Sequence, residues 1–195
     1  MKNLIKKSLL IVAVFIAITV TATELESGVT LKIDSKLIDL SLYNTDGDLT
    51  VRVKDSNGYV LYTERFEGQD YSKKYDLNTL PNGDYFFEIE GQTKIKLVPF
   101  KVKSKGVILN NASKTSMFKP IVRQDNSKVY ISQLALNSEP LKVVFYDKSY
   151  NVLYKEVLNG SVNLEKVLNI SKLKKGDYIL KMSSNTQSFT KNIRK

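Results

Sequence analysis

An internal duplication constrains this sequence more than any other feature. Residues 28–75 align with residues 120–167 at a constant offset of 92 without a gap, and 12 of these 48 positions are identical. After one inserted residue the offset becomes 93, and Leu80-Pro-Asn-Gly-Asp-Tyr85 matches Leu173-Lys-Lys-Gly-Asp-Tyr178. Two unrelated segments would not keep register over such a length. The sequence therefore predicts two copies of one module of about 75 residues.

Each copy has the pattern of short β-strands separated by turns. In the first copy Leu49, Val51 and Val53 alternate with polar residues, which is the period of a strand with one buried face. Asp55-Ser56-Asn57-Gly58 then predicts a hairpin turn, because Asn-Gly accepts a positive φ. The predicted strands are 29–33, 37–43, 49–54, 59–66, 71–77, 85–90 and 93–102, followed by 121–123, 129–136, 141–147, 151–158, 165–170, 178–183 and 187–194.

Seven short strands in each copy predict an all-β fold of two tandem immunoglobulin-like, or fibronectin-III-like, β-sandwiches. The expected order is an N-terminal signal peptide at 1–22, a first sandwich at 23–102, a linker at 103–119 and a second sandwich at 120–195. A strand at 107–109 is one option within the linker.

The first 22 residues have the composition of a secretory signal peptide. Three lysines precede the apolar run 9–17, and Val20-Thr21-Ala22 suits signal peptidase. The alternative is an uncleaved anchor, but the uncharged run 8–23 is 16 residues long and a little short to span a bilayer. No later stretch is apolar enough to cross a membrane. We therefore expect an exported chain in the periplasm, at the cell surface or outside the cell, with no transmembrane span after cleavage.

Two tyrosines are predicted to have a structural role. Tyr85 and Tyr178 each follow a Gly-Asp turn, at Gly83 and Gly176, and open the sixth strand. This is the position of a tyrosine corner, in which the hydroxyl group bonds the backbone a few residues upstream. The alternative is an ordinary glycine turn followed by a core tyrosine. Two residues later, Phe87 and Leu180 stand where antibody domains carry a cysteine, so a large apolar side chain is expected to replace the disulfide there.

Composition removes most catalytic chemistry. The chain has no Cys and no His, which excludes thiolate and imidazole catalysis and zinc sites that need those ligands. Asn44, Asp46 and Asp48 are a weak Ca²⁺ candidate, because oxygen ligands at alternate positions suit this ion. Turns also collect such residues for backbone reasons alone. We predict no enzyme activity and no cofactor.

The positive charge is unevenly distributed. The formal net charge of +10 divides into +3 for residues 1–22, −2 for 23–105 and +9 for 106–195. The candidate anion-binding residues are Lys172, Lys174, Lys175, Lys191, Arg194 and Lys195. An acidic glycan is one possible partner, and a solvated basic surface is the alternative. Nucleic acid is not expected of an exported chain without a recognised binding motif.

Four segments of the second copy form a recognisable set: Val143–Asp147, Asn151–Tyr154, Leu173–Met182 and the basic segment Ser188–Lys195. In these segments the chain resembles the C-terminal sorting domain of proteins exported by the type IX system of Bacteroidota. The glycine usual in the Asp-x-x-Gly turn of that family is Tyr150 here, whereas the first copy keeps Gly58. The resemblance implies an immunoglobulin-like fold and recognition by the secretion machinery.

Three functions follow as hypotheses. The leading one is an exported, non-enzymatic β-sandwich protein for binding, adhesion or envelope structure, with another surface protein as a possible partner. The second is a type IX secretion substrate whose second module is mainly a sorting signal. The third is a glycan- or Ca²⁺-binding module.

Overall fold

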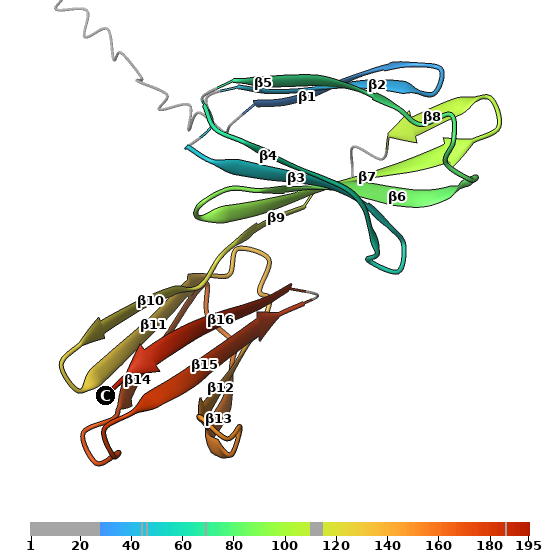
Figure 1. Cartoon of the computed structure of the whole chain (residues 1–195). Coiled ribbons are helices and arrows are strands. Elements are labelled where there is room, and N and C mark those ends of the chain that lie inside the picture. Colours follow the sequence, from blue (N-terminus) through green and yellow to red (C-terminus); the bar gives the residue numbers. More distant parts are fainter. Residues whose placement is uncertain (1–27, 44, 46, 69, 110–114, 186) are drawn as a thin grey trace, which may run out of the picture.

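The computed structural model describes residues 28–43, 45, 47–68, 70–109, 115–185 and 187–195, so the predicted signal peptide at 1–22 lies outside the described residues. Every regular element in the described part is a β-strand. The strands form two bodies that follow one another along the chain, as the change from blue and green to orange and red shows (Figure 1).

The first body is a sandwich of two antiparallel sheets. One sheet has the order β1-β2-β5, and the facing sheet has the order β4-β3-β6-β7-β8. Their bounds are β1 Gly28–Asp34, β2 Leu37–Tyr43, β3 Leu49–Asp55, β4 Val60–Phe66, β5 Tyr71–Asp76, β6 Gly83–Glu90, β7 Lys94–Lys103 and β8 Gly106–Leu109.

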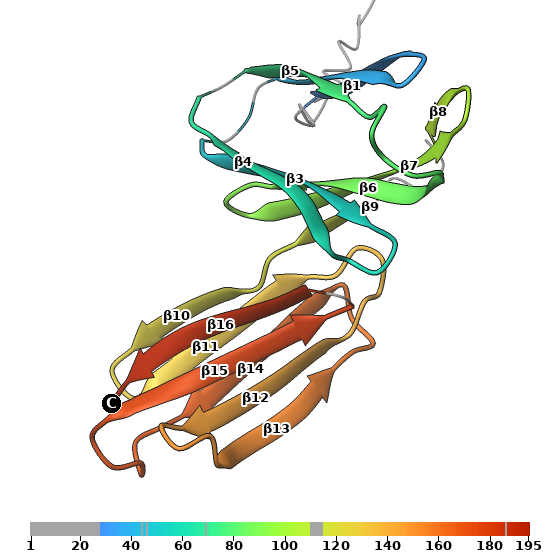
Figure 2. The same cartoon turned by 45° about the vertical axis from the view of Figure 1, so that its right-hand side comes forward.

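The second body repeats this plan with three strands facing four. Its sheets have the orders β10-β11-β14 and β13-β12-β15-β16, and the two layers are clearest in the turned view (Figure 2). The bounds are β10 Ile121–Asp125, β11 Lys128–Leu134, β12 Leu141–Asp147, β13 Val152–Leu158, β14 Asn163–Asn169, β15 Asp177–Ser184 and β16 Gln187–Arg194. The predicted fold class, two tandem fibronectin-III-like sandwiches, is confirmed.

Alternation along the strands builds a separate apolar core in each module. Val51 on β3 lies opposite Ile89 on β6, and Val143 on β12 lies opposite Met182 on β15, all of them buried. Phe87 and Leu180 occupy the centres of the two cores and are both 0% exposed. They fill the position at which the sequence predicts an apolar replacement for a disulfide.

The region predicted as a linker, 103–119, contributes strands to the first sandwich. β8 pairs with the C-terminal half of β7, where Phe100 faces Leu109. A further strand, β9 (Thr115–Phe118), pairs with the N-terminal half of β7, where Lys94 faces Phe118. Two strands of the segment predicted as a linker therefore extend a sheet of the first module beyond residue 102. β7 is long enough for β8 and β9 to pair with different halves of it. The alternating pattern of β7 itself does not show that these strands pair there.

The constant offset of 92 is also wrong in detail. Ser35 (φ 56°) and Asn126 (φ 50°) occupy the same left-handed turn position, so the copies differ by 91 there. The offset is 92 at β3 and β12, and it is already 93 at β5 and β14, where Tyr75 and Leu168 are equivalent. The second module has one more residue before β12 and another before β14, and loops tolerate such insertions more easily than strands.

One side chain on the outward face of β6, where alternation predicts exposure to solvent, is buried at the junction of the modules. Glu88 on β6 is 2% exposed, although the alternation of β6 places it outward. Its carboxylate accepts hydrogen bonds from Arg52 (3.0 Å), Lys54 (2.5 Å) and, from the second module, Gln187 Nε2 (2.8 Å). The β15–β16 hairpin of the second module thus covers part of the outer face of the first.

Removing the central side chain of either core should unfold the module that contains it. We expect Leu180→Ala to lower the free energy of unfolding of the second module by about 2–5 kcal/mol, because a cavity adds to the lost apolar burial. Val157→Ala, at a 49% exposed position of the same sheet, is the control and should change it by less than about 0.5 kcal/mol. Hydrogen exchange read separately for the two modules measures both, and a loss spread equally over the first module would contradict the independence of the cores.

Candidate functional site

Both tyrosines at the Gly-Asp turns bond the backbone four residues upstream. The Tyr85 hydroxyl donates to the Pro81 carbonyl oxygen (2.9 Å), and the Tyr178 hydroxyl donates to that of Lys174 (2.8 Å). Each ring is buried and stacks on a core ring, with centroids 5.7 Å apart for Tyr85 and Phe100. This hydrogen bond fixes the loop that carries Lys174.

The two turn glycines differ in conformation. Gly176 has a φ of 156°, and its backbone N–H and C=O both bond the backbone of Lys195 (3.2 and 2.9 Å). Gly83 has no positive φ, and a Cβ there would meet the Tyr85 ring at 3.5 Å, an ordinary contact. Gly176 therefore joins the β14–β15 loop to the end of β16, and Gly83 pairs in the same way with Val102 near the end of β7.

Only part of the candidate Ca²⁺ turn can be described. Asn44 and Asp46 lie outside the described residues, and the Asp48 carboxylate accepts a hydrogen bond from Arg65 (2.9 Å). Among the residues that the structure describes, no group of three or more Asp or Glu side chains is placed to hold a metal ion.

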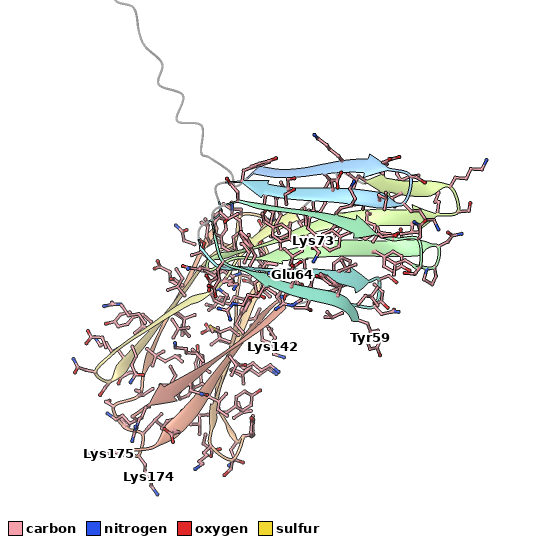
Figure 3. All side chains as sticks on the ribbon, turned by 45° about the horizontal axis from the view of Figure 1, so that its top comes forward. Tyr59, Glu64, Lys73, Lys142, Lys174 and Lys175 are labelled. Carbon is pink, nitrogen blue, oxygen red and sulfur yellow. The ribbon has the colours of Figure 1, made fainter. Side chains whose placement is uncertain are left out.

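The predicted anion-binding residues divide between two places. Lys172, Lys174 and Lys175 are exposed on the β14–β15 loop, and Arg194 and Lys195 end β16 beside that loop. Figure 3 shows Lys174 and Lys175 at the end of the second module that points away from the first. We call these five residues the basic end.

Lys191 is not part of the basic end. It lies opposite Leu180 and shares the strand parity of the buried Ile193, whereas Arg194 has the opposite parity. Lys195 is also partly engaged, since its ammonium donates to Ser127 Oγ (2.8 Å). The structure places the loop cations beside one another, whereas the sequence alone does not separate the two faces of β16, and anion binding by these residues stays a prediction.

In each sandwich a polar cluster connects two edge strands, one from each sheet. The sequence alone does not predict this cluster. In the first module the Lys73 ammonium on β5 donates to Glu64 on β4 (2.7 Å) and to the Tyr62 hydroxyl (2.6 Å). In the second module Lys166 contacts Glu156 (2.5 Å), which also accepts from the Tyr154 hydroxyl. We call each Tyr–Glu–Lys set a clasp, because it joins an edge strand of one sheet to an edge strand of the other (Figure 3).

The clasp in the first module has two further tyrosines. Tyr71 donates to Glu64 (2.8 Å) and bonds Tyr75 (2.7 Å), and burial raises the pKa of Tyr75 to about 12. The hydrogen bond from Lys73 lowers the pKa of Glu64, and the bond from Lys166 lowers that of Glu156. The corrected offset of 93 makes Lys73 and Lys166 equivalent, whereas an offset of 92 had paired Lys166 with Lys74. The two clasps are therefore the same arrangement in both copies of the module, and each connects the two sheets of its sandwich.

The sequence profile of one protein family matches both modules. This family is described as "Secretion system C-terminal sorting domain", and it matches residues 26–102 and 125–195. A search of curated proteins finds no match to the chain. Within the described residues, no helix has the length and apolar character needed to cross a membrane.

Two solved structures illustrate the wider likeness. A domain titled "Biofilm associated protein - BSP domain" is 14% identical, with 85% of this chain and 29% of that chain covered and a TM-score of 0.29. The FN1–FN3 domains of chicken CNTN1 are 11% identical, with 84% and 63% covered and a TM-score of 0.29. The chain thus spans less than two thirds of either structure, and at these TM-scores neither likeness bears on function.

The clasp predicts an acid-sensitive contribution to stability. Because the pKa of Glu64 is lower in the folded state, the ionised pair stabilises the fold above the unfolded pKa of about 4.3 and is lost as the pH falls through the lowered folded value. We expect Glu64→Gln to reduce stability at pH 7 by less than about 1 kcal/mol, since the pair is partly exposed. The difference from wild type should shrink as the pH falls below about 4.3 and through the lowered folded pKa of Glu64.

Urea unfolding of the first module at pH 7 and pH 3 measures this effect. Glu67→Gln, which removes an exposed carboxylate from the same region, is the matched control. An equal effect of both substitutions at both pH values would rule out the clasp as the cause.

Proposed function

Since the chain belongs to the family of secretion-system C-terminal sorting domains and matches it twice, we propose that it is a type IX secretion substrate whose second module is the address read at export. The observation that carries this proposal is the match of residues 125–195 to the sorting family on a complete sandwich of its own. Export to the cell surface or beyond follows from that role.

The basic end distinguishes the second copy as the address. At the positions equivalent to Lys174 and Lys175 the first copy has Pro81 and Asn82, so its loop has no cations there. The tyrosine hydrogen bond and the Gly176–Lys195 bonds hold the basic loop in one conformation without using its ammonium groups. A fixed, exposed and positively charged loop supports recognition by a complementary acidic surface.

A non-enzymatic role of the chain after export is part of the proposal. The chain has no Cys or His, and the family is described by sorting rather than by a reaction. The first module, with its slightly acidic charge, would then serve binding, adhesion or envelope structure. Loss of a measured hydrolytic activity on substitution of one Asp, Glu or Ser would contradict this part.

The charge of the basic loop provides the test of the address. We expect the double variant Lys174→Glu, Lys175→Glu to accumulate in the periplasm, with surface delivery reduced about tenfold or more, as expected when a charge-complementary contact is reversed. Both side chains are exposed, and the hydrogen bond from Tyr178 uses the Lys174 backbone, so the fold should be unchanged. Cell fractionation and protease accessibility of intact cells measure delivery.

The matched control is Lys103→Glu, Lys105→Glu, which reverses two exposed charges on the first module. It should be delivered like wild type. Wild-type delivery of the Lys174, Lys175 variant would overturn the proposal. Point substitutions are sharper than deleting residues 173–195, because that deletion removes β15 and β16 and with them Leu180 and Ile193 of the core.

A further inference from the structure

A shallow hollow lies on the outer face of the four-stranded sheet of the second module. Its volume is about 510 Å³, and its lining includes Lys148, Asp177, Ile179, Asn192 and Arg194. Ile179 and Asn192 lie opposite each other on β15 and β16, and Asp177 lies opposite Arg194. These residues alternate with the buried Tyr178 and Ile193, so they face away from the core.

The charges of this hollow are not neutralised within the sheet. Neither Lys148 nor Arg194 has an ion pair with a carboxylate of the described residues, although Asp177 faces Arg194 in the strand register. In the first module the equivalent pair, Asp84 and Lys101, does form an ion pair (3.1 Å). Lys181, which lies two residues along β15 from Ile179, adds a third exposed cation to the same face.

Two tyrosines stand beside the hollow. Tyr146 lies directly opposite Ile179 on the neighbouring strand, and the Tyr150 ring is 6.0 Å from the Tyr146 ring. Tyr150 is 69% exposed and has a φ of 63°, a left-handed conformation that is unfavourable for a bulky side chain. The first copy keeps Gly58 (φ 86°) at this turn, so the second copy retains an exposed ring where glycine would be more stable.

The first module has no counterpart of this face. Where the second has Lys148, Asn192 and Lys181, the first has Ser56, Pro99 and Glu88, and Glu88 is buried against Gln187. The combination of cations, an amide, a half-buried ring and an exposed ring is therefore found in one copy only. Common ancestry of the two sheets does not account for it.

We infer that this hollow binds an acidic sugar unit of a polysaccharide. The Arg194 guanidinium matches a carboxylate in a two-pronged contact, with Lys148 as a second positive charge. The Tyr146 and Tyr150 rings are tilted by 58° and, with Ile179, offer apolar surface to one side of a sugar ring, and the Asn192 amide can bond its hydroxyls. The volume lies in the range of ordinary ligand sites. An anionic membrane would meet only a narrow apolar strip here, which favours the sugar.

Titration of the purified chain with polygalacturonate tests the inference, independently of export. We expect binding that weakens as salt is raised and that is absent for the methyl-esterified polymer, whose carboxylates are neutral. Arg194→Gln should weaken binding about tenfold or more, because it removes a charge-assisted contact. Lys101→Gln, at the equivalent position of the first module, should bind like wild type.

Tyr150→Gly separates binding from folding. Because glycine relieves the left-handed conformation, this variant should be at least as stable as wild type and yet bind polygalacturonate several-fold more weakly. Equal binding of the methyl-esterified polymer, or unchanged affinity of both variants, would overturn the inference. Binding to vesicles of anionic lipid with no binding to polygalacturonate would also overturn it and would point to a membrane surface.

Discussion

Each sandwich is held together by the packing of apolar side chains between its two sheets, and the chain has no cysteine that could form a covalent cross-link. Phe87 lies at the centre of the first core, with ring centroids 5.1 Å from Tyr75 and 5.0 Å from Phe100, so aromatic contacts join both sheets there. Leu180 fills the same position in the second core. A slip of one residue would turn these side chains to the solvent face, and emptying a core position is costly. The strands that carry them therefore keep their register. Insertions between the copies are therefore confined to loops, where they produce the offsets of 91, 92 and 93.

A fixed core leaves the outer faces free to diverge, and the two copies have done so at equivalent positions. Glu88 in the first module is enclosed by Arg52, Lys54 and a glutamine from the second module, and these partners offset the cost of burying its carboxylate. Its equivalent in the second module, Lys181, remains exposed on a face with few acids. The outer sheet surface around Glu88 in the first module thus contacts the second module, whereas the equivalent surface around Lys181 in the second module is exposed to solvent.

The sequence predicts whatever depends on local pattern. The strands, the Asp55 and Asp147 turns, and the burial of Phe87 and Leu180 all follow from alternation and turn chemistry. It does not predict what depends on how strands meet. The pairing of β8 and β9 with β7, the burial of Glu88, and the clasp between Glu64 and Lys73 each need a partner distant in sequence. Of the candidate site, the sequence reveals the basic loop, because its lysines are close together in the chain. It does not reveal that Lys191 and Arg194 lie on opposite faces of β16, since that depends on how β16 pairs with β15.

The junction also distinguishes the equivalent outer sheet faces of the two modules, because it covers part of the face of the first. Because the β15–β16 hairpin of the second module lies against Glu88, this part of the outer face of the first module is covered by its neighbour, and Lys119 forms an ion pair with Glu90 nearby (2.6 Å). Burial by itself disfavours the Glu90 carboxylate, but its bonds to Lys119 and Arg52 lower its pKa overall. Glu88 and Glu90 of the first module are thus paired within the chain, whereas Lys148 and Arg194 of the second module have no carboxylate partner among the described residues. An anionic partner would therefore meet the second module, where the strained Tyr150 holds an aromatic ring beside unpaired charge.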